Sequence, residues 1–231
     1  MLKRHYFIGN FDLNSKEIIC LDTEIIHHIK DVLKLKEGEE VILCDGEGKA
    51  AIVKIEKIAK KEISFFVKNF LPGVVNDRKI VLYAALLKRD SFEWLLEKAT
   101  EAGVSVIVPI ISERTVKIGL NEKRWQKIIK EAAEQSQSLI LPKLSPLQNF
   151  KDALENKNGV GIFFDPAGEN IKEVKIANST ISLFIGPEGG WTDKEIEICK
   201  KSDLHFVNLG VSILRAETAA TVAVYLAKNI F

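Results

Sequence analysis

The feature that most constrains this chain is an alternation of apolar runs and helix-like segments that begins near residue 80. A continuous apolar run of buried-strand length is found at residues 80–87, and further strand-like segments are found at 104–111, 160–164 and 181–185. Helical patterns are found at residues 91–102, 124–136, 194–200 and 217–228. Such alternation predicts an α/β fold with a parallel sheet that carries helices on both faces. In open sheets of this kind, ligands bind in the crevice at the carboxyl ends of the strands.

The N-terminal third has a different pattern of apolar residues. Short strand-like runs at 41–44, 50–58 and 62–67 are separated by turn formers, which predicts a small β-barrel or sheet. The turn-forming residues 71–77 precede the change of rhythm, so we place a domain boundary near residue 73. The sequence therefore predicts a β-rich domain over 1–72 and an α/β domain over 73–231.

One helix interrupts the predicted β-rich domain. Its apolar residues are spaced so that they share one face, and Asp22 or Thr23 is the expected cap. The residues of that face are Ile25, Ile26, Ile29, Val32 and Leu33.

Composition excludes several classes of protein. Lys and Arg total 33 against 32 Asp and Glu, so bulk charge gives no argument for nucleic acid or an anionic membrane. Cys20, Cys44 and Cys199 form no C-x-x-C pair, which argues against a zinc site and a disulfide framework and fits a reducing cytoplasm. Because no sustained apolar run of ~18 residues is present, we expect no export signal and no membrane anchor.

A glycine-rich loop stands between a strand and a helix at residues 183–195, LFIGPEGGWTDKE. Thr192 and Glu195 have the spacing of a capping box that opens the helix. Taken alone, the loop is typical of a tight turn that needs positive φ. It matches neither the phosphate-binding G-x-x-x-x-G-K-[ST] pattern nor G-x-G-x-x-G. A loop with backbone donors and no lysine suits a ligand without phosphates.

A second strand, glycine loop and helix follow at residues 206–220, FVNLGVSILRAETAA. Most of the helix, residues 219–227, is small and apolar nearly all round, which predicts burial against several neighbours. Arg215 directly precedes the start of this helix, and Glu217 lies at its start. They are interpreted either as a structural ion pair with a helix-start carboxylate or as functional groups, and the residues alone leave both open.

Together, the segments FIGPEGGWTDKEIE and LGVSILRAETAATVAVY resemble the paired C-terminal motifs of the small-subunit ribosomal RNA methyltransferase E (RsmE-type) family of the SPOUT superfamily. Similarity extends to residues 4–7, 27–34, 88–93, 97–101, 112–115 and 131–136. The resemblance implies an N-terminal PUA-like β-barrel that binds RNA and a C-terminal SPOUT domain with a deep trefoil knot. It also implies S-adenosyl-L-methionine as cofactor, N3 of a uridine in 16S ribosomal RNA as target, and a cytoplasmic homodimer.

The resemblance also implies roles for residues of the two loops. Cofactor contacts are expected from Phe164, Gly186, Glu188, Gly190, Leu209, Gly210 and Leu214. Backbone groups would read the adenine edge, while Leu209 and Leu214 would form apolar walls. Arg215 would stabilise negative charge on the uracil oxygens, and Glu217 would accept the N3 proton or orient the group that does. No metal is expected.

Cationic residues at family positions are candidates for RNA phosphate contacts. They are Arg4, Lys34, Arg89 and Arg114. Each one alone is more typical of a solvated surface residue. Tyr6 and Phe7 would stack on a base or, more typically, pack in the core. His27 and His28 lack metal-ligand spacing and are expected at the surface or near RNA.

The chain departs from the family pattern at two places and leaves other functions open. Gln137 and Ser138 replace the usual Gly-Arg, and Ala102 replaces a Leu before Gly103. The alternatives are a SPOUT enzyme acting on a ribose 2′-oxygen or a guanine, and a non-catalytic RNA-binding factor of ribosome assembly. A phosphate-binding NTPase is disfavoured by the missing lysine fingerprint. The target nucleotide, and whether free RNA or an assembled subunit is the substrate, stay open.

Overall fold

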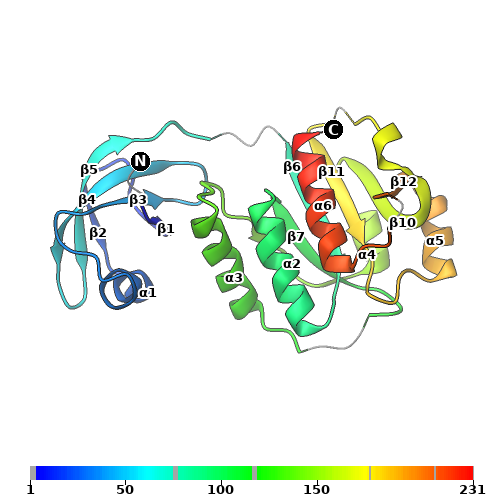
Figure 1. The fold of residues 1–231 in the computed structure, drawn as a ribbon, viewed down its shortest axis with the longest axis horizontal. Helices are drawn as coiled ribbons and strands as arrows, with labels where there is room; N and C mark the ends of the chain where they lie inside the picture. Colours follow the sequence, from blue (N-terminus) through cyan, green and yellow to red (C-terminus); the bar gives the residue numbers. More distant parts are fainter. Residues whose placement is uncertain (1–3, 75–77, 116–118, 177, 211, 231) are drawn as a thin grey trace. The chain divides into compact units, whose positions relative to one another are not determined.

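The computed structural model describes residues 4–74, 78–115, 119–176, 178–210 and 212–230 (Figure 1). The chain forms two compact units. The first contains Met1–Val75 and Ala133–Leu141, and the second contains Asn76–Ala132 and Pro142–Phe231. The return of residues 133–141 to the first unit was not predicted from the sequence.

The first unit is built on a five-stranded sheet with the order β1-β3-β4-β5-β2. Its strands are β1 (Tyr6–Ile8), β2 (Glu17–Cys20), β3 (Glu40–Cys44), β4 (Ala50–Ile58) and β5 (Ile63–Phe70). Strand β1 pairs with β3 in parallel, and the other neighbours are antiparallel. Buried and exposed residues alternate along β5, as expected where one face of a sheet covers a core. The predicted β-rich domain is confirmed.

The predicted helix of this unit is present, and its apolar face is one residue shorter than expected. Helix α1 (Thr23–His27) is capped by Asp22 and continues into a π-helical turn, His28–Val32. Because a π-helical turn contains more residues than an α-helical turn, spacing along an α-helix misplaces Val32, the last residue of the turn, whereas Leu33, the next residue, packs against the core. Val32 is 58% exposed, so the prediction that it packs with Ile25, Ile26 and Ile29 is wrong.

Residues 133–141 pack on the part of the first sheet that contains β1 and β3. Ala133 is buried there with Ile8 and Ile42. The backbone N–H of Ile8 donates to the Glu134 carboxylate at 2.8 Å, and the N–H of Gly48 donates to the Leu139 carbonyl at 2.9 Å. These contacts join segments that are about ninety or more residues apart in the sequence, so local pattern could not have predicted them.

Gln137, which stands where the family usually has glycine, lies just after the end of helix α3 (Glu122–Gln135). Ser138 N–H donates to the Ala133 carbonyl and Gln137 N–H to the Glu134 carbonyl, which is the hydrogen-bond pattern of a Schellman motif. Gln137 takes the left-handed position of that motif, with φ +60°. Glycine adopts this conformation without a Cβ penalty, and glutamine does so at a cost in free energy.

The second unit contains a seven-stranded sheet with the order β12-β10-β11-β6-β7-β8, and β9 pairs with β7. Every pairing is parallel. The strands are β6 (Lys79–Ala85), β7 (Val106–Ile111), β8 (Lys143–Leu144), β9 (Gln148–Asn149), β10 (Val160–Asn170), β11 (Thr180–Ile185) and β12 (Leu204–Asn208). The other helices are α2 (Arg89–Glu101), α4 (Phe150–Glu155), α5 (Asp193–Lys200), α6 (Ala216–Asn229) and a 3-10 turn at Ile171–Glu173. The predicted parallel α/β architecture is confirmed.

Side chains of β6 alternate between two separate cores. Ile80 and Leu82 pack with residues of α2 and α6, whereas Val81 and Tyr83 pack with residues of α4 and α5. A strand that is apolar on both faces is the reason that the run at 80–87 shows no polar alternation. Helices therefore cover both faces of this sheet, as the sequence predicted. Within the described part of the chain, no helix is both long enough and apolar enough to span a membrane.

Candidate functional site

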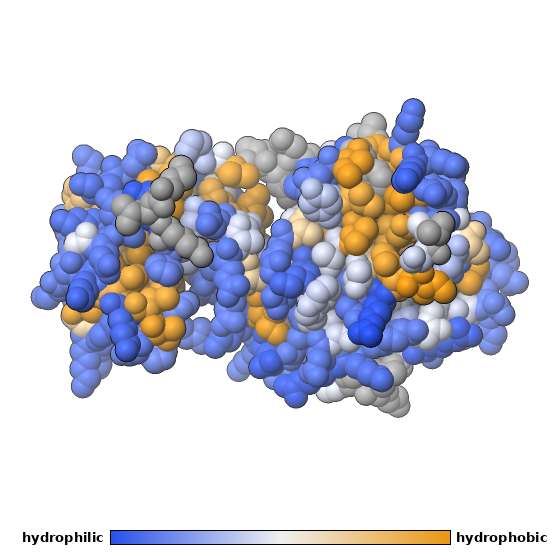
Figure 2. Space-filling view, in the orientation of Figure 1, coloured by the Kyte–Doolittle hydropathy of each residue, from blue (hydrophilic) through white to orange (hydrophobic). Residues whose placement is uncertain are grey.

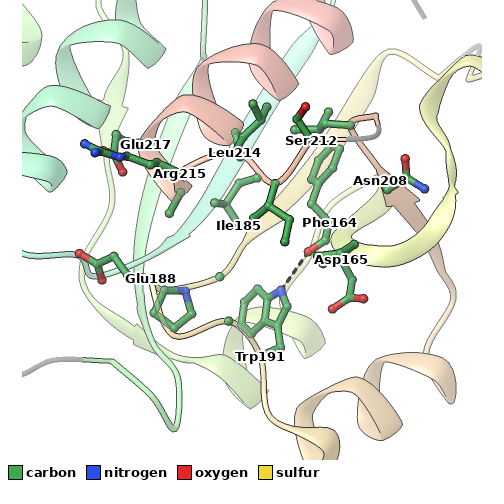
Figure 3. A pocket seen from close by; sticks show the side chains of 18 of the residues that line it. Phe164, Asp165, Ile185, Glu188, Trp191, Asn208, Ser212, Leu214, Arg215 and Glu217 are labelled. Atoms are coloured by element: carbon green, nitrogen blue, oxygen red, sulfur yellow. Dashed lines mark hydrogen bonds between the residues drawn. The ribbon is translucent and has the colours of Figure 1, made fainter.

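A cavity of about 650 Å³ lies in the second unit, beside residues 164–166 of β10, at the carboxyl ends of β11 and β12 and at the starts of α2 and α6 (Figure 3). Its volume is within the range of small-molecule sites, ~300–1,000 Å³. The crevice predicted at the carboxyl ends of the parallel strands is therefore present. Both glycine loops line it, although their glycines, Gly186 and Gly210, are separated by a complete helix and strand.

All nine residues predicted for cofactor binding and catalysis line this one cavity. They are Phe164, Gly186, Glu188, Gly190, Leu209, Gly210, Leu214, Arg215 and Glu217. The structure thus brings them together, and their individual roles stay predictions. The cavity is also lined by residues that the sequence analysis did not single out, including Lys88, Ser91, Asp165, Ile185 and Trp191.

Trp191 explains why residue 186 is a glycine. Its indole is 6% exposed and its Nε1–H donates to the Phe164 carbonyl at 3.1 Å. An added Cβ at Gly186 would lie 2.9 Å from Trp191 Cε2, closer than real Cβ contacts. The tryptophan ring also packs on the ring of Phe163, with centroids 4.7 Å apart. The indole therefore fixes the first loop against β10 (Figure 3).

Glu188 connects the first loop to helix α2. Its Oε1 accepts a hydrogen bond from the backbone N–H of Lys88 at 2.9 Å, and Lys88 is the N-cap residue of α2. The N-terminus of a helix has unpaired N–H groups and a partial positive charge, so a carboxylate is favoured there. Glu188 therefore positions the loop as well as lining the cavity.

The predicted capping box after the first loop is confirmed. Thr192 Oγ1 accepts from the Glu195 N–H at 3.3 Å, and the Glu195 carboxylate accepts from the Thr192 N–H at 2.8 Å. Glu195 is only 3% exposed. The box begins α5 directly after Trp191, so the loop ends at a fixed point.

The second loop is held to a bulge in β10. Strand β10 pairs with β12 in two registers, so that both Phe164 and Glu169 oppose Val207, and the intervening residues bulge toward the cavity. The Asn208 side chain donates to the Gly168 carbonyl and accepts from the Gly210 N–H at 3.1 Å.

Two glycines of these loops have backbone conformations that other residues rarely adopt. Gly190 has φ +69° and Gly210 has φ +129°, and a Cβ at either would meet no atom within 4 Å. The expectation of positive φ in the first loop is confirmed, and the second loop has the same feature at Gly210. The need for glycine at both positions is thus a matter of backbone conformation and not of space.

Arg215 and Glu217 lie on one side of the cavity, with Asp165 and Asn208 on the other (Figure 3). Arg215 is exposed, and within the described residues no carboxylate lies within 4.0 Å of its guanidinium. The structural ion pair considered from the sequence is therefore not found. Glu217 is half-buried in the first turn of α6, where a carboxylate also stabilises the helix.

Helix α6 is buried on one side. Ala220, Ala223, Val224 and Ala227 form its buried stripe, whereas Tyr225 is 56% exposed. The helix packs on α2, β6 and β11, so the predicted packing against several neighbours is confirmed, whereas the residues on its outer side are half-buried or exposed.

The charges around the cavity include three carboxylates, from Asp165, Glu188 and Glu217, and two cations, Lys88 and Arg215. Apolar walls come from Phe164, Ile185, Leu209 and Leu214. This lining fits a partly apolar, cationic ligand better than a nucleotide with several phosphates, because polyphosphate sites concentrate positive charge and backbone N–H groups.

The four cationic RNA candidates are divided between the units. In the first unit, Arg4 pairs with Glu40 at 2.6 Å, and Lys34 is exposed with φ +54°. In the second, Arg89 Nε lies 3.3 Å from Glu93, and Arg114 Nη1 donates to the carbonyls of Gly189 and Trp191. The structure thus gives Arg114 a contact with the first glycine loop that the sequence analysis did not predict.

The aromatic and histidine candidates also have defined places. Phe7 is 1% exposed and belongs to the core, in agreement with the more typical of its two interpretations. His27 is exposed and lies 2.7 Å from Asp31, whereas His28 is half-buried with its ring edge against Phe7. Among the described residues, no cluster of His, Cys, Asp and Glu side chains has the arrangement of a metal site.

Comparisons with known proteins agree with this geometry. Residues 75–228 match the RNA methyltransferase domain family, and residues 21–68 match the RNA methyltransferase PUA domain family. The ribosomal RNA small subunit methyltransferase E of Rickettsia conorii is 30% identical over 96% of this chain and 93% of its own length. That of Synechocystis is 33% identical over 89% of this chain and 71% of its own length.

A solved structure is similar over the whole chain. The ribosomal RNA small subunit methyltransferase E of Neisseria gonorrhoeae, crystallised with S-adenosyl methionine, superposes with a TM-score of 0.89 at 27% identity. The match covers 96% of this chain and 95% of that one. With a matching domain family over most of its second unit and relatives at 30% identity or more along nearly its full length, the chain belongs to the ribosomal RNA small subunit methyltransferase E family.

Proposed function

We propose that this protein is an S-adenosyl-L-methionine-dependent methyltransferase that modifies N3 of a uridine in 16S ribosomal RNA. The observation that carries the proposal is that two glycine loops, distant in the sequence, line one cavity together with every predicted cofactor and catalytic residue. Membership of the methyltransferase E family supports the same reaction.

The cavity fits the cofactor in size and lining. Its volume of about 650 Å³ is adequate for a ligand of that size, and Leu209 and Leu214 supply apolar walls for adenosine. Backbone groups around Gly186 and Gly210 are open to the cavity, because these residues have no side chain to cover them. Asp165 supplies negative charge for a cationic ligand. When bound, the cofactor supplies an electrophilic methyl group on a sulfonium.

In the proposed reaction, Arg215 and Glu217 act on the uracil. The bound cofactor would supply its methyl group to uracil N3 and leave as the neutral thioether, and the Glu217 carboxylate would accept the N3 proton. Arg215 stabilises the negative charge on the neighbouring carbonyl oxygens. Its guanidinium is suited to this role, because it is exposed and has no carboxylate within 4.0 Å among the described residues. Positioning of the two reactants supplies much of the remaining acceleration.

Substitution of these two residues tests the proposal. Arg215→Ala and Glu217→Gln are each expected to lower the rate of 3-methyluridine formation by about 100-fold or more. Cofactor affinity, measured by calorimetry, should stay at the wild-type value. If both variants keep wild-type turnover, the assignment is wrong. If they instead lose folding stability in urea titrations, the residues have the structural role considered from the sequence.

We propose that residues 1–72 form a PUA-like RNA-binding domain and residues 73–231 the methyltransferase domain. Arg4 and Lys34 in the first, with Arg89 in the second, are the proposed phosphate contacts. Arg114 was also predicted to be one, but its guanidinium donates to two carbonyls of the first glycine loop. The matched PUA and methyltransferase families support this division. Methylation assays on free 16S ribosomal RNA and on assembled small subunits, run in parallel with labelled cofactor, would identify which of the two is the substrate in the cytoplasm.

A homodimer is also proposed. Ile213 is 87% exposed, Tyr225 56% and Ile230 64%, and all three belong to or flank α6. Figure 2 shows apolar side chains gathered on the face of the second unit where α6 lies. Exposed apolar residues in such a cluster are typical of protein contacts. Sedimentation equilibrium should give twice the chain mass of 25.9 kDa, and a monomer at micromolar concentration would contradict the proposal.

The trefoil knot implied by the family is proposed for the C-terminal end. Strand β12 lies beyond β10 at the edge of the sheet, whereas the following helix α6 packs on α2, β6 and β11. The chain between them therefore turns back past β10. This return path supports a knot in which the segment between β12 and α6 passes through the loop that includes the bulge of β10.

A further inference from the structure

The loop that follows β7, residues 112–115, has a rigid shape of its own. The Thr115 hydroxyl accepts a hydrogen bond from the Ser112 N–H at 2.9 Å, and the Thr115 N–H donates to the Ser112 carbonyl at 3.1 Å. Ser112 is 5% exposed. The turn therefore presents Glu113 and Arg114 in a fixed orientation.

Arg114 spans the end of the first glycine loop. Its Nη1 donates to the carbonyl of Gly189 at 2.9 Å and to the carbonyl of Trp191 at 3.1 Å. Its stem also covers Gly189, since an added Cβ there would be 3.5 Å from Arg114 Cβ and Cδ. The two accepting carbonyls flank Gly190, whose φ is +69°. A single guanidinium therefore holds the carbonyls on both sides of Gly190, a residue whose backbone has no side chain to restrict it.

A second link joins the first turn of α5, directly after the first loop, to the loop that follows β7. Glu195 is almost fully buried, and its Oε1 accepts from the backbone N–H of Glu113 at 2.9 Å. Its Oε2 accepts from the N–H and the hydroxyl of Thr192, at 2.8 and 3.1 Å. Three donors and the N-terminus of α5 offset the cost of burying this carboxylate.

We infer that Arg114 is a positioning residue of the cofactor site, which acts through the carbonyls of Gly189 and Trp191. It keeps residues 186–191 in the conformation that forms one wall of the cavity, with Glu195 fixing the turn that carries it. A preorganised loop does not have to be ordered when the ligand binds, and affinity rises accordingly. The inference rests on the proposed placement of the cofactor in this cavity.

This role differs from a phosphate contact in what it predicts. A phosphate contact would be kept by Arg114→Lys, would change RNA affinity and its salt dependence, and would leave cofactor affinity alone. A positioning role depends on the two-carbonyl geometry of a guanidinium. A lysine ammonium is a point charge on a flexible stem, so it is expected to replace that geometry only in part.

The test is a calorimetric titration of S-adenosyl-L-methionine without RNA, on the full chain. We expect Arg114→Ala to weaken binding on the order of 10-fold, as for the loss of hydrogen bonds to a charged donor, and Arg114→Lys to weaken it less. With saturating cofactor and RNA, the kcat of Arg114→Ala should stay within about twofold of wild type, since this side chain acts on binding. Lys151→Ala, an exposed residue of α4, is the control and should bind as wild type.

Hydrogen exchange gives a second readout that does not depend on activity. Amides of residues 188–191 should exchange faster in Arg114→Ala than in wild type, with other regions unchanged. Wild-type cofactor affinity and unchanged exchange in Arg114→Ala would overturn the inference, most clearly if RNA affinity fell instead.

A third variant separates this inference from the proposed site. Gly186→Val would place a branched side chain against Trp191 and into the loop. If Gly186→Val loses cofactor binding and Arg114→Ala does not, the site is correct and the positioning role is wrong. If both bind normally, the placement of the cofactor itself is wrong.

Discussion

Replacing Gly186 with alanine is the smallest change that perturbs the first loop from within. The new Cβ would lie 2.9 Å from Cε2 and 3.0 Å from Nε1 of Trp191, where something must shift. The indole cannot retreat easily, because it packs against Phe163 at 4.7 Å and Phe150 at 5.0 Å between ring centroids. Either the ring tilts and loses its 3.1 Å hydrogen bond to the Phe164 carbonyl, or the loop moves into the cavity.

The expected size of the effect follows from these two routes. Overpacking of a buried contact costs ~1–3 kcal/mol, and the loss of one buried hydrogen bond adds about 1 kcal/mol. We therefore expect the free energy of unfolding to fall by about 1–4 kcal/mol in urea titrations, with the upper part of the range reached if the hydrogen bond is lost. Cofactor affinity should fall at least about 10-fold by calorimetry, since 1.4 kcal/mol of loop displacement is sufficient for that change.

Gly119→Ala is the matched control for this substitution. A Cβ at Gly119 meets no atom within 4 Å, and its backbone φ is outside the left-handed range. The control should change the free energy of unfolding by less than about 0.5 kcal/mol, as is usual for surface positions. If Gly186→Ala also stays within that limit and binds cofactor as wild type, the packing of Trp191 on the loop is not a constraint and the reasoning is refuted.

Three other predictions concern features outside the cavity. Gln137→Gly should raise the free energy of unfolding by about 0.5–1 kcal/mol in urea titrations, because φ +60° suits glycine, and a decrease would contradict the Schellman assignment. The hydrogen bond from Arg124 lowers the pKa of the Glu93 carboxyl, so the stabilisation by this carboxylate is complete above the unfolded pKa of about 4.3 and is lost as pH falls through the lower folded pKa. The difference in unfolding free energy between wild type and Glu93→Gln should therefore shrink between about pH 5 and pH 3, and a constant difference would show that the pair is not responsible. Burial, and after it the charge of Glu195, raises the pKa of the Cys199 thiol to about 12, and burial also raises the pKa of Cys44. A thiol reagent at pH 8 should therefore label the native protein slowly, whereas it should label all 3 cysteines after denaturation.

The sequence was most informative where burial is greatest. The runs at 80–87 and 181–185 correspond to β6 and β11, which are apolar on both faces and so leave an unbroken pattern. The capping box of Thr192 and Glu195 was predictable because its hydrogen bonds are local. The glycine loops were recognisable because positive φ demands a residue type that is visible in the sequence.

The remaining features depend on contacts that no local pattern encodes. Strands β1, β8 and β9 contain two or three residues each, too few for periodicity to register. The π-helical turn that exposes Val32 changes the period within a helix. The packing of Trp191 on Gly186 and the contact of Arg114 with the same loop join separate elements, so an isolated Trp or Arg in the sequence does not reveal them.

The most direct test of the account uses tritium-labelled cofactor, 16S ribosomal RNA and nucleoside digestion, with wild type and Gly186→Val in parallel. The account predicts label in 3-methyluridine with wild type and none with Gly186→Val, because one cavity between the two loops both holds the cofactor and meets the base. Label in a 2′-O-methylated or methylguanosine product, or equal 3-methyluridine from both proteins, would contradict it.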